Sequence, residues 1–333
     1  MKSKEEFDSY YEKELKRKIE DLEVQRLAIT EKYSYKRYWK NLMWLVILFV
    51  ALVVGSIFIP AIPEQVESLF PFIIVYAIGA AIYIYVMRAK KFKPVKLDYQ
   101  QTVITKIIAF VDPQLKYNHL EGISAREFEA GGLFGSYTSY KSEDLVYGNT
   151  NGMELRMSDI NCTRRKSGSG KNSSSTTVTV FKGFYIISKL NEKIPAGVII
   201  KPSSGVADAF KGLASSFLGS KLVNSIVDKF SLNDIEVGDA EFDKQYHVKS
   251  VSPEVAKELL TPRFIQLIKT FQQEANLPVS LSFFDSNVHI AFSGINLFEA
   301  DPYTSFIEKD ISKQYFNYLN LAYGVVEAIR ASR

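Results

Sequence analysis

Two long apolar runs near the N-terminus constrain this chain more than any other feature of its sequence. Leu42–Ile59 and Leu69–Met87 contain no charged residue. A helix rises about 1.5 Å per residue, so each run has about the length needed to cross the ~30 Å hydrocarbon core of a bilayer. Neither run shows the polar stripe of a helix that meets water on one face. We therefore predict a transmembrane helical hairpin over residues 41–88.

The charges that flank the two runs predict an orientation. Basic residues precede the first run and follow the second, whereas the connecting turn carries Glu64 and Glu67 and has no lysine or arginine. Because segments rich in Lys and Arg stay on the cytoplasmic side, both termini are predicted to face the cytoplasm. The lipid bilayer is thus a predicted partner. The side chains expected at its surface are Lys36, Arg37, Lys40, Arg88, Lys90, Lys91 and Lys93.

Composition narrows the function classes. No ionisable residue lies within either run, so the hairpin is expected to anchor rather than to conduct ions or relay protons. The net charge of +4 is modest and much of it lies beside the predicted membrane segment, which predicts no nucleic-acid partner. Cys162 is the single cysteine, which excludes an intramolecular disulfide and agrees with a reducing compartment.

The segments next to the hairpin are predicted to be helical. Residues 1–40 read as a cytosolic amphipathic helix whose apolar stripe is interrupted by Arg26. This helix either pairs with a partner helix or packs on its own domain. Residues 89–119 are expected to form a juxtamembrane linker helix that ends near Asp112.

Residues 120–333 are predicted to form a cytosolic α+β domain with a mainly antiparallel sheet, because neighbouring hairpins outnumber strand–helix–strand alternations. Turn residues are expected over Tyr147–Gly152. The other expected elements are a strand over Met153–Ile160, a hairpin tip at Ser167–Ser175, an extended segment over Glu241–Val251, helices that start at Pro253 and Pro262, a hairpin made of Val279–Phe284 and Val288–Phe292, and a final helix over Tyr303–Arg330.

Gly205–Phe230 carries apolar residues at helical spacing, with mostly serine and glycine on the opposite face. Such a helix either covers the sheet of its own domain or lies on a membrane surface, and the sequence leaves both interpretations open.

The sequence predicts no cofactor and no catalytic constellation. His119, His247 and His289 do not have the spacing that places two metal ligands on one helix face, and no glycine-rich phosphate loop is present. Cys162 precedes the basic segment Thr163–Lys166, and nearby positive charge can lower the pKa of a thiol. An unreactive cysteine near a strand end is the simpler interpretation.

Acidic residues provide the one candidate site in the domain. Glu143 and Asp144 lie in a segment rich in turn residues, and a second group of acids precedes a predicted strand. We take Glu143, Asp144, Asp239 and Glu241 as the candidates for a cation or partner site. Hydrated turns also collect acidic residues for structural reasons alone.

Several stretches together resemble an uncharacterised bacterial membrane family known as domain of unknown function 3137. They are Ile123–Phe128, Gly132–Phe134, Tyr140–Gly148, Phe181–Phe184, Asp239–Val248, Leu260–Pro262 and Phe298–Glu299. The resemblance implies a bacterial protein of the inner membrane with two spans and no assigned biochemical role. It carries no catalytic residue over to this chain.

Three functions are consistent with these features. The first is a binding or scaffolding module that the hairpin holds at the inner membrane, where it recruits a protein partner or a lipid surface. The second is a membrane-tethered enzyme that uses the acids near Glu143 or Asp239. The third is an accessory subunit of a transport system that forms a homo-oligomer through Gly55 and Gly79.

Overall fold

The computed structural model divides the chain into two compact units, which are described separately below. The sheet unit contains residues 1–10, 101–299 and 311–333, and the helical unit contains residues 11–100 and 300–310. The residues that the structure describes are 2–58, 70–150, 152–166, 175–203, 232–275, 277, 279–295, 297–298, 301–308 and 311–331. The helix expected over Gly205–Phe230 and most of the hairpin tip expected at Ser167–Ser175 lie outside these residues.

The sheet unit is an α+β fold, as the sequence predicts. Its elements in chain order are α1 (Lys4–Tyr10), α5 (Thr105–Val111), β1 (Lys116–Asn118), α6 (Ala125–Ala130), β2 (Ser139–Thr150), β3 (Met153–Lys166), β4 (Thr176–Pro202), β5 (Asn233–Ile235), α9 (Ala240–Gln245), β6 (Tyr246–Ser250), α10 (Pro253–Leu259), α11 (Pro262–Ala275), β7 (Val279–Ser293) and α12 (Ile311–Ala331). The strands run in the order β1-β2-β3-β4-β6-β5, and β7 also pairs with β4. The strand pairs in the described residues are antiparallel.

Strand β4 is the central strand of this sheet. Its first part pairs with β3 and its last part with β6, whereas β7 pairs with both parts. Because a strand has two hydrogen-bonding edges, β3 and β6 share one edge of β4 and β7 occupies the other. The apolar runs Phe184–Ile187 and Val198–Ile200 are buried throughout, which is the pattern of a strand covered on both faces.

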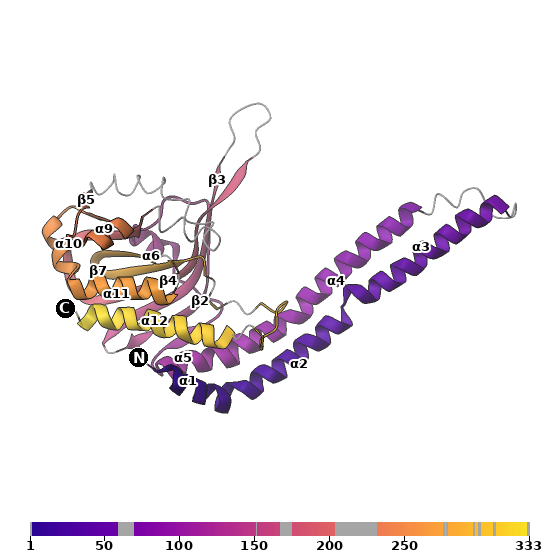
Figure 1. Ribbon diagram of the computed structural model, residues 1–333, viewed down its shortest axis with the longest axis horizontal. Helices are drawn as coiled ribbons and strands as arrows, with labels where there is room; N and C mark the ends of the chain where they lie inside the picture. The colour runs from indigo at the N-terminus through magenta and orange to yellow at the C-terminus, as the bar shows by residue number, and fades with distance from the viewer. Residues whose placement is uncertain are drawn as a thin grey trace. The chain divides into compact units, whose positions relative to one another are not determined.

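Different helices cover the two faces of the sheet (Figure 1). On one face, Phe264 of α11 packs against Phe283 of β7, and Tyr315 of α12 packs against Phe298. On the other face, Phe128 of α6 contacts Phe181 and Tyr185 of β4. Both layers are therefore held by aromatic contacts, which bury large apolar areas.

A buried polar group ties three elements of the sheet unit together. Asp112 ends α5, and its carboxylate accepts hydrogen bonds from the hydroxyls of Thr150, at the end of β2, and Tyr323 of α12. The Tyr323 bond measures 3.1 Å. Each of these groups would be costly to bury without its partners, so together they specify how α5, β2 and α12 meet.

The helical unit consists of long helices and one short returning segment. Its elements are η1 (Tyr11–Leu15), α2 (Lys16–Lys32), α3 (Tyr35–Phe58) and α4 (Phe70–Asp98), and η3 (Tyr99–Ile104) continues from α4 towards α5. Arg26, which interrupts the apolar stripe in the sequence, is buried in an ion pair with Glu23 at 2.7 Å. Glu23 also accepts the backbone N–H of Phe306 at 3.0 Å, which holds segment 301–308 against α2.

One helix of the described chain is long and apolar enough to cross a membrane. It starts at Pro71, has a mean hydropathy of 1.9 over its best window, and only 6% of that window is buried. Helix α3 contains a shorter apolar stretch, Tyr38–Val54. The described part of α3 ends at Phe58, and residues 59–69 lie outside the described structure. The structure thus supports one candidate span directly.

The predicted hairpin over Val279–Phe292 is wrong, because these residues form the single strand β7. Asp285, Ser286 and Asn287 are polar and read as a turn, yet the chain continues and pairs with β4 on both sides of them. Asp285 has a φ of 51°, and the register shifts on both sides of its partner Ile194, so the extra residues of this irregularity lie on β4 rather than on β7.

Three other local predictions need correction. The segment expected to be extended from Glu241 begins with helix α9, and only Tyr246–Ser250 is a strand. The turn expected over Tyr147–Gly152 is shorter, because β2 continues to Thr150. The last helix begins at Ile311 rather than Tyr303. In α9, the side chain of Asp239 accepts the N–H of Phe242, a helix cap that overrides the local strand pattern.

We expect glycine substitutions at two neighbouring positions of β7, the left-handed Asp285 and the extended Ser286, to change the stability of the protein differently. Asp285→Gly removes a side chain from a left-handed backbone, whereas Ser286→Gly loosens ordinary strand backbone. Both changes add similar freedom to the unfolded chain, so their difference isolates the strain. The free energy of unfolding of the full chain in detergent should be roughly 1 kcal/mol higher for Asp285→Gly than for Ser286→Gly.

The ion pair between Asp285 and Lys193 is highly exposed and its loss should contribute little. Equal stability of the two glycine variants, measured by urea unfolding followed by circular dichroism, would contradict the left-handed conformation of Asp285.

Candidate functional site

Large apolar side chains cover the outward surfaces of α3 and α4. Trp44, Leu48 and Val50 of α3 are at least half exposed, as are Phe72, Val75 and Ile78 of α4. Exposed apolar area is unfavourable in water by about 25 cal/mol per Å². A continuous surface of this kind is typical of a site that contacts lipid or another apolar surface.

The predicted lipid-contact residues gather at one end of the α3–α4 pair. Tyr35 and Tyr38 at the start of α3 contact Arg88 and Tyr83 in the second half of α4, which continues to Asp98, so the two helices run antiparallel here. Lys36, Lys40, Lys90, Lys91 and Lys93 are exposed there, and the side chain of Arg37 lies outside the described structure. Helix packing thus brings together basic residues that the sequence separates by the whole apolar hairpin.

Arg88 differs from the other basic residues of this group. It is partly buried, and its guanidinium lies over the rings of Tyr35, Phe92 and Tyr303 at 5.8, 5.7 and 5.4 Å. Cation–π contacts of this kind hold the charge in place. The sequence did not reveal this arrangement, because Tyr303 is far from Arg88 along the chain.

Two of the predicted acidic residues, Asp239 and Glu241, converge on a lysine. Both carboxylates pair with Lys269 of α11, at 3.1 and 2.8 Å. The pKa of Asp239 is lowered, first by the N–H of Phe242 and then by Lys269. These carboxylates therefore have an internal partner that caps α9 and fastens it to α11.

The other two acids, Glu143 and Asp144, lie on β2 at an irregularity of its pairing with β3. Glu143 forms an exposed ion pair with Lys141 at 2.8 Å. Asp144 is buried with a φ of 62° and accepts the hydroxyl of Tyr117. Strands β3 and β4 lie between β2 and β6 in the sheet, so the two acidic pairs belong to separate places in the fold.

A third acidic residue, Asp159, lies next to Glu143 and Asp144, and the sequence pattern did not indicate it. It lies opposite Glu143 on β3, is buried, and accepts the N–H groups of Leu297 and Phe298 at 2.9 and 2.8 Å. Burial raises the pKa of Asp159 well above its usual range, although the two N–H groups oppose this shift. Its role is to hold the chain that follows β7. Among the described residues no group of three metal-binding side chains occurs.

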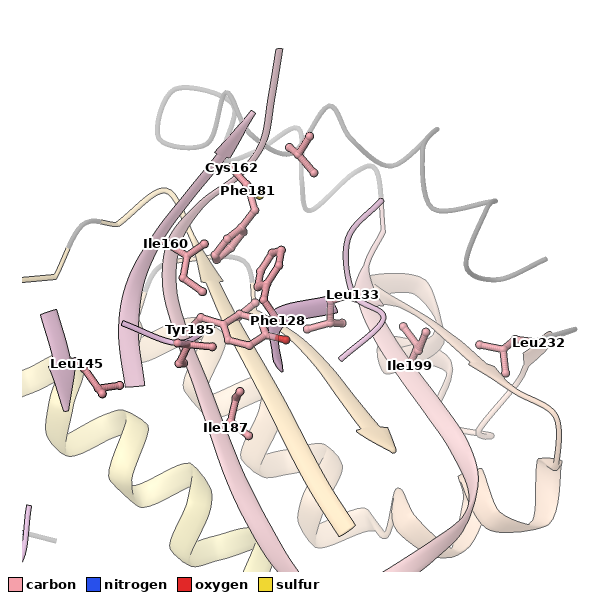
Figure 2. Packing of buried hydrophobic residues seen from close by; sticks show 13 residues of the cluster. Phe128, Leu133, Leu145, Ile160, Cys162, Phe181, Tyr185, Ile187, Ile199 and Leu232 are labelled. Carbon is pink, nitrogen blue, oxygen red and sulfur yellow. The ribbon is translucent and has the colours of Figure 1, made fainter. Parts of the chain in front are cut away.

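Tyr185 and Cys162 belong to a buried cluster that also contains Phe128 and Phe181 (Figure 2), and His289 contacts this cluster through Tyr185. The hydroxyl of Tyr185 lies 3.2 Å from Nδ1 of His289, and burial lowers the pKa of His289 to about 4. A Cβ on Gly131 would lie 2.8 Å from Cγ of His289, so the loop after α6 depends on glycine at this position. His289 is therefore a neutral core residue at physiological pH.

Lys201 completes this cluster from the end of β4. Its amine donates to the carbonyl of Leu133 and lies 5.7 Å from the centre of the Phe134 ring. Burial, with a smaller contribution from Lys249, lowers the pKa of Lys201 to about 7. The sequence offered no signal for this lysine, because its surroundings come from a loop much earlier in the chain.

Cys162 is part of the same cluster and is fully buried in β3 (Figure 2). Burial raises the pKa of its thiol to about 12. The basic residues that follow it in the sequence therefore do not activate it, because burial of the thiol dominates its pKa.

Comparisons with known proteins cover part of the chain. Residues 179–330 match the model of a family described as "Protein of unknown function (DUF3137)". The match includes four of the segments on which the resemblance was noted, and Ile123–Phe128, Gly132–Phe134 and Tyr140–Gly148 lie before it. No protein with a curated description matches the chain.

A search of solved structures finds similarity to the crystal structure of the mycobacterial trehalose monomycolate transport factor A, TtfA. The two chains are 9% identical, and the alignment covers 68% of this chain and 95% of that one with a TM-score of 0.32.

We expect Cys162 to resist alkylation in the folded chain. A pKa of about 12, against an ordinary 9.0, lowers the thiolate fraction at pH 8 by roughly a thousandfold. Labelling with iodoacetamide, read by intact mass, should be complete only after unfolding. The matched control is Asn161→Cys in a Cys162→Ala chain, since position 161 is exposed. Similar labelling rates for the two thiols would contradict the buried placement.

The lowered pKa of Lys201 predicts a pH-dependent stability. Between pH 7 and 10.5 the unfolded chain keeps the proton that the folded chain has lost, so stability should rise with pH in this window. The Tm of the wild type should therefore gain roughly 3 °C or more relative to Lys201→Met between pH 7 and pH 10. Lys182→Met, at an exposed position, serves as the control. A constant difference between wild type and Lys201→Met would contradict the prediction.

Proposed function

We propose that the protein is a two-span anchor of the bacterial inner membrane that presents its sheet unit as a binding or scaffolding module in the cytoplasm. The observation that carries this proposal is the apolar surface of α4, of which only 6% is buried over a span-length window. Lipid is the medium in which such a surface is stable.

The second span and the orientation rest on further observations. Helix α3 packs on α4 and exposes Trp44, Ile47 and Leu48, so it shares the apolar surroundings of its neighbour. Exposed lysines of both helices gather near the start of α3, where it contacts Arg88 in the second half of α4. Basic residues at that end favour the cytoplasmic side for the N-terminus and for the chain after α4.

Binding is favoured over catalysis by what the candidate residues do. Asp239 and Glu241 pair with Lys269, Glu143 with Lys141, and Asp144 accepts from Tyr117. The carboxylates that would serve an acid–base mechanism thus have structural partners. We propose that the sheet unit recognises a protein partner through its surface.

A charge placed in the middle of α4 tests the anchor. Ile78→Arg, at a half-exposed position, adds about 2.5–3.5 kcal/mol to the cost of insertion. The fraction of the chain that stays in membranes after carbonate extraction should fall several-fold. The control is Leu120→Arg, because Leu120 is exposed on the sheet unit and lies outside the proposed spans.

Topology is read with reporters fused at three places: the N-terminus, the C-terminus and the segment between Glu64 and Glu67. Green fluorescent protein should fluoresce at both termini, and alkaline phosphatase should be active only in the 64–67 segment. Extraction of the wild type by carbonate, or an active phosphatase at either terminus, would overturn the proposal.

A further inference from the structure

A groove of about 500 Å³ lies between α3 and α4, within the helical unit. Small side chains of α4 face larger ones of α3, and both sets follow helical spacing, so each lies along one helix face. The residues that form its walls are Ala77, Ala80 and Ala81 of α4 and Tyr38, Trp39 and Leu42 of α3. The alanines leave space that their neighbours do not fill, and the volume is within the range of ligand sites, about 300–1,000 Å³.

Gly79 does not contribute to this groove. A Cβ at position 79 would meet no atom within 4 Å, so within one chain Gly79 makes no close helix contact. The space therefore results from the alanines rather than from the glycine that the sequence singled out.

One end of the groove is cationic. Lys36 and Tyr35 line this end, and the Tyr35 ring lies under the guanidinium of Arg88. The Nε atom of Arg88 is buried and has no hydrogen-bond partner among the residues that the structure describes. A guanidinium has only donors, and a buried donor without an acceptor is costly. Arg88 does not itself line the groove but lies beside it, behind Tyr35, and this donor has no acceptor among the described residues.

We propose that the groove binds one acyl chain of an anionic phospholipid, whose phosphate accepts hydrogen bonds from Arg88 and Lys36. The inference rests on the proposed function, since it requires α3 and α4 to lie in a bilayer. Basic pockets between membrane helices on the cytoplasmic side recognise anionic headgroups, and the apolar walls suit the attached chain.

A helix from a second copy of the chain fits the groove less well. Its apolar runs, residues 42–59 and 69–87, have no acidic residue that could meet Arg88. A free phosphate would satisfy Arg88 but would leave the apolar walls uncovered. A phospholipid supplies both the anion and the apolar chain in one molecule.

The two tryptophans of the chain allow the test to separate insertion from binding. Trp39 lines the groove, whereas Trp44 is 68% exposed and does not. In the Trp44→Phe chain the fluorescence of Trp39 reports the groove, and in the Trp39→Phe chain that of Trp44 reports insertion. The full chain is placed in nanodiscs of phosphatidylcholine that contain rising fractions of lipid with brominated acyl chains, which quench tryptophan on contact.

We expect half-maximal quenching of Trp39 at about a fivefold lower fraction of brominated phosphatidylglycerol than of brominated phosphatidylcholine, the factor that about 1 kcal/mol of attraction to one basic residue provides. Trp44 should be quenched equally by both lipids. Arg88→Gln should abolish the preference of Trp39. The matched control Lys90→Gln removes the same charge from an exposed position and should keep the preference. Ala80→Phe, which fills the groove, should reduce maximal quenching of Trp39 by either lipid.

Other outcomes overturn the inference. Equal quenching by the two lipids would exclude selective binding, and equal effects of Arg88→Gln and Lys90→Gln would mean diffuse attraction only. Loss of the preference on adding millimolar inorganic phosphate at constant ionic strength would indicate an ion site. Cross-linked dimers with Trp39 protected from both lipids would indicate a second copy. Absence of Trp44 quenching by any lipid would instead reject the proposed membrane insertion.

Discussion

The sheet unit depends on β4. Strands pair with both edges of β4 at residues 183–188 and 198–200, and these residues are buried, so the neighbouring strands are positioned by contact with it. Gly183 shows how little space remains: a Cβ there would meet the backbone of Phe292 on the paired strand. A central strand of this kind leaves few free groups, and the buried polar side chains around it fasten loops to strands. The buried Asp159 and the half-buried Lys201 are examples, because each is hydrogen-bonded to the backbone of a distant segment.

The sequence predicted the features whose cause is local. Ser252 caps α10 and Pro253 follows it at the first turn, so the start of this helix needs no tertiary information. The alternation over Met153–Ile160 likewise predicted β3. The failures have a tertiary cause. The polar residues after Phe284 continue the strand instead of forming a turn because β4 pairs with β7 on both sides of them, and β4 carries the extra residues at this irregularity.

The candidate site shows the same limit. The acidic residues near Glu143 and Asp239 could be selected from the sequence as a candidate site. Their partners could not be predicted, because a carboxylate on a hydrated turn and a carboxylate in an internal ion pair have the same sequence pattern. These partners are Lys141, Tyr117 and Lys269. Arg26 was misread for a similar reason. A charge within an apolar stripe suggests an interrupted helix face, yet Glu23 neutralises it, and the same carboxylate accepts the N–H of Phe306. A buried charge is strongly destabilising unless it is paired, as Arg26 is with Glu23. The backbone partner of Glu23, Phe306, lies far along the chain and could not be predicted from the sequence.

Position, rather than charge alone, distinguishes Arg88 from its neighbours. Exposed lysines such as Lys90 and Lys91 attract any anionic surface by about 1 kcal/mol each, without preference for one lipid molecule. Arg88 is surrounded by three aromatic rings, so its guanidinium is oriented before any anion arrives and little side-chain entropy remains to be lost on binding. Selective recognition requires such a fixed group next to a shaped cavity. In the helical unit, the rings of Tyr35, Phe92 and Tyr303 hold that group beside the groove, which Tyr35 itself lines, whereas exposed lysines such as Lys90 and Lys91 can only hold the protein near the membrane surface.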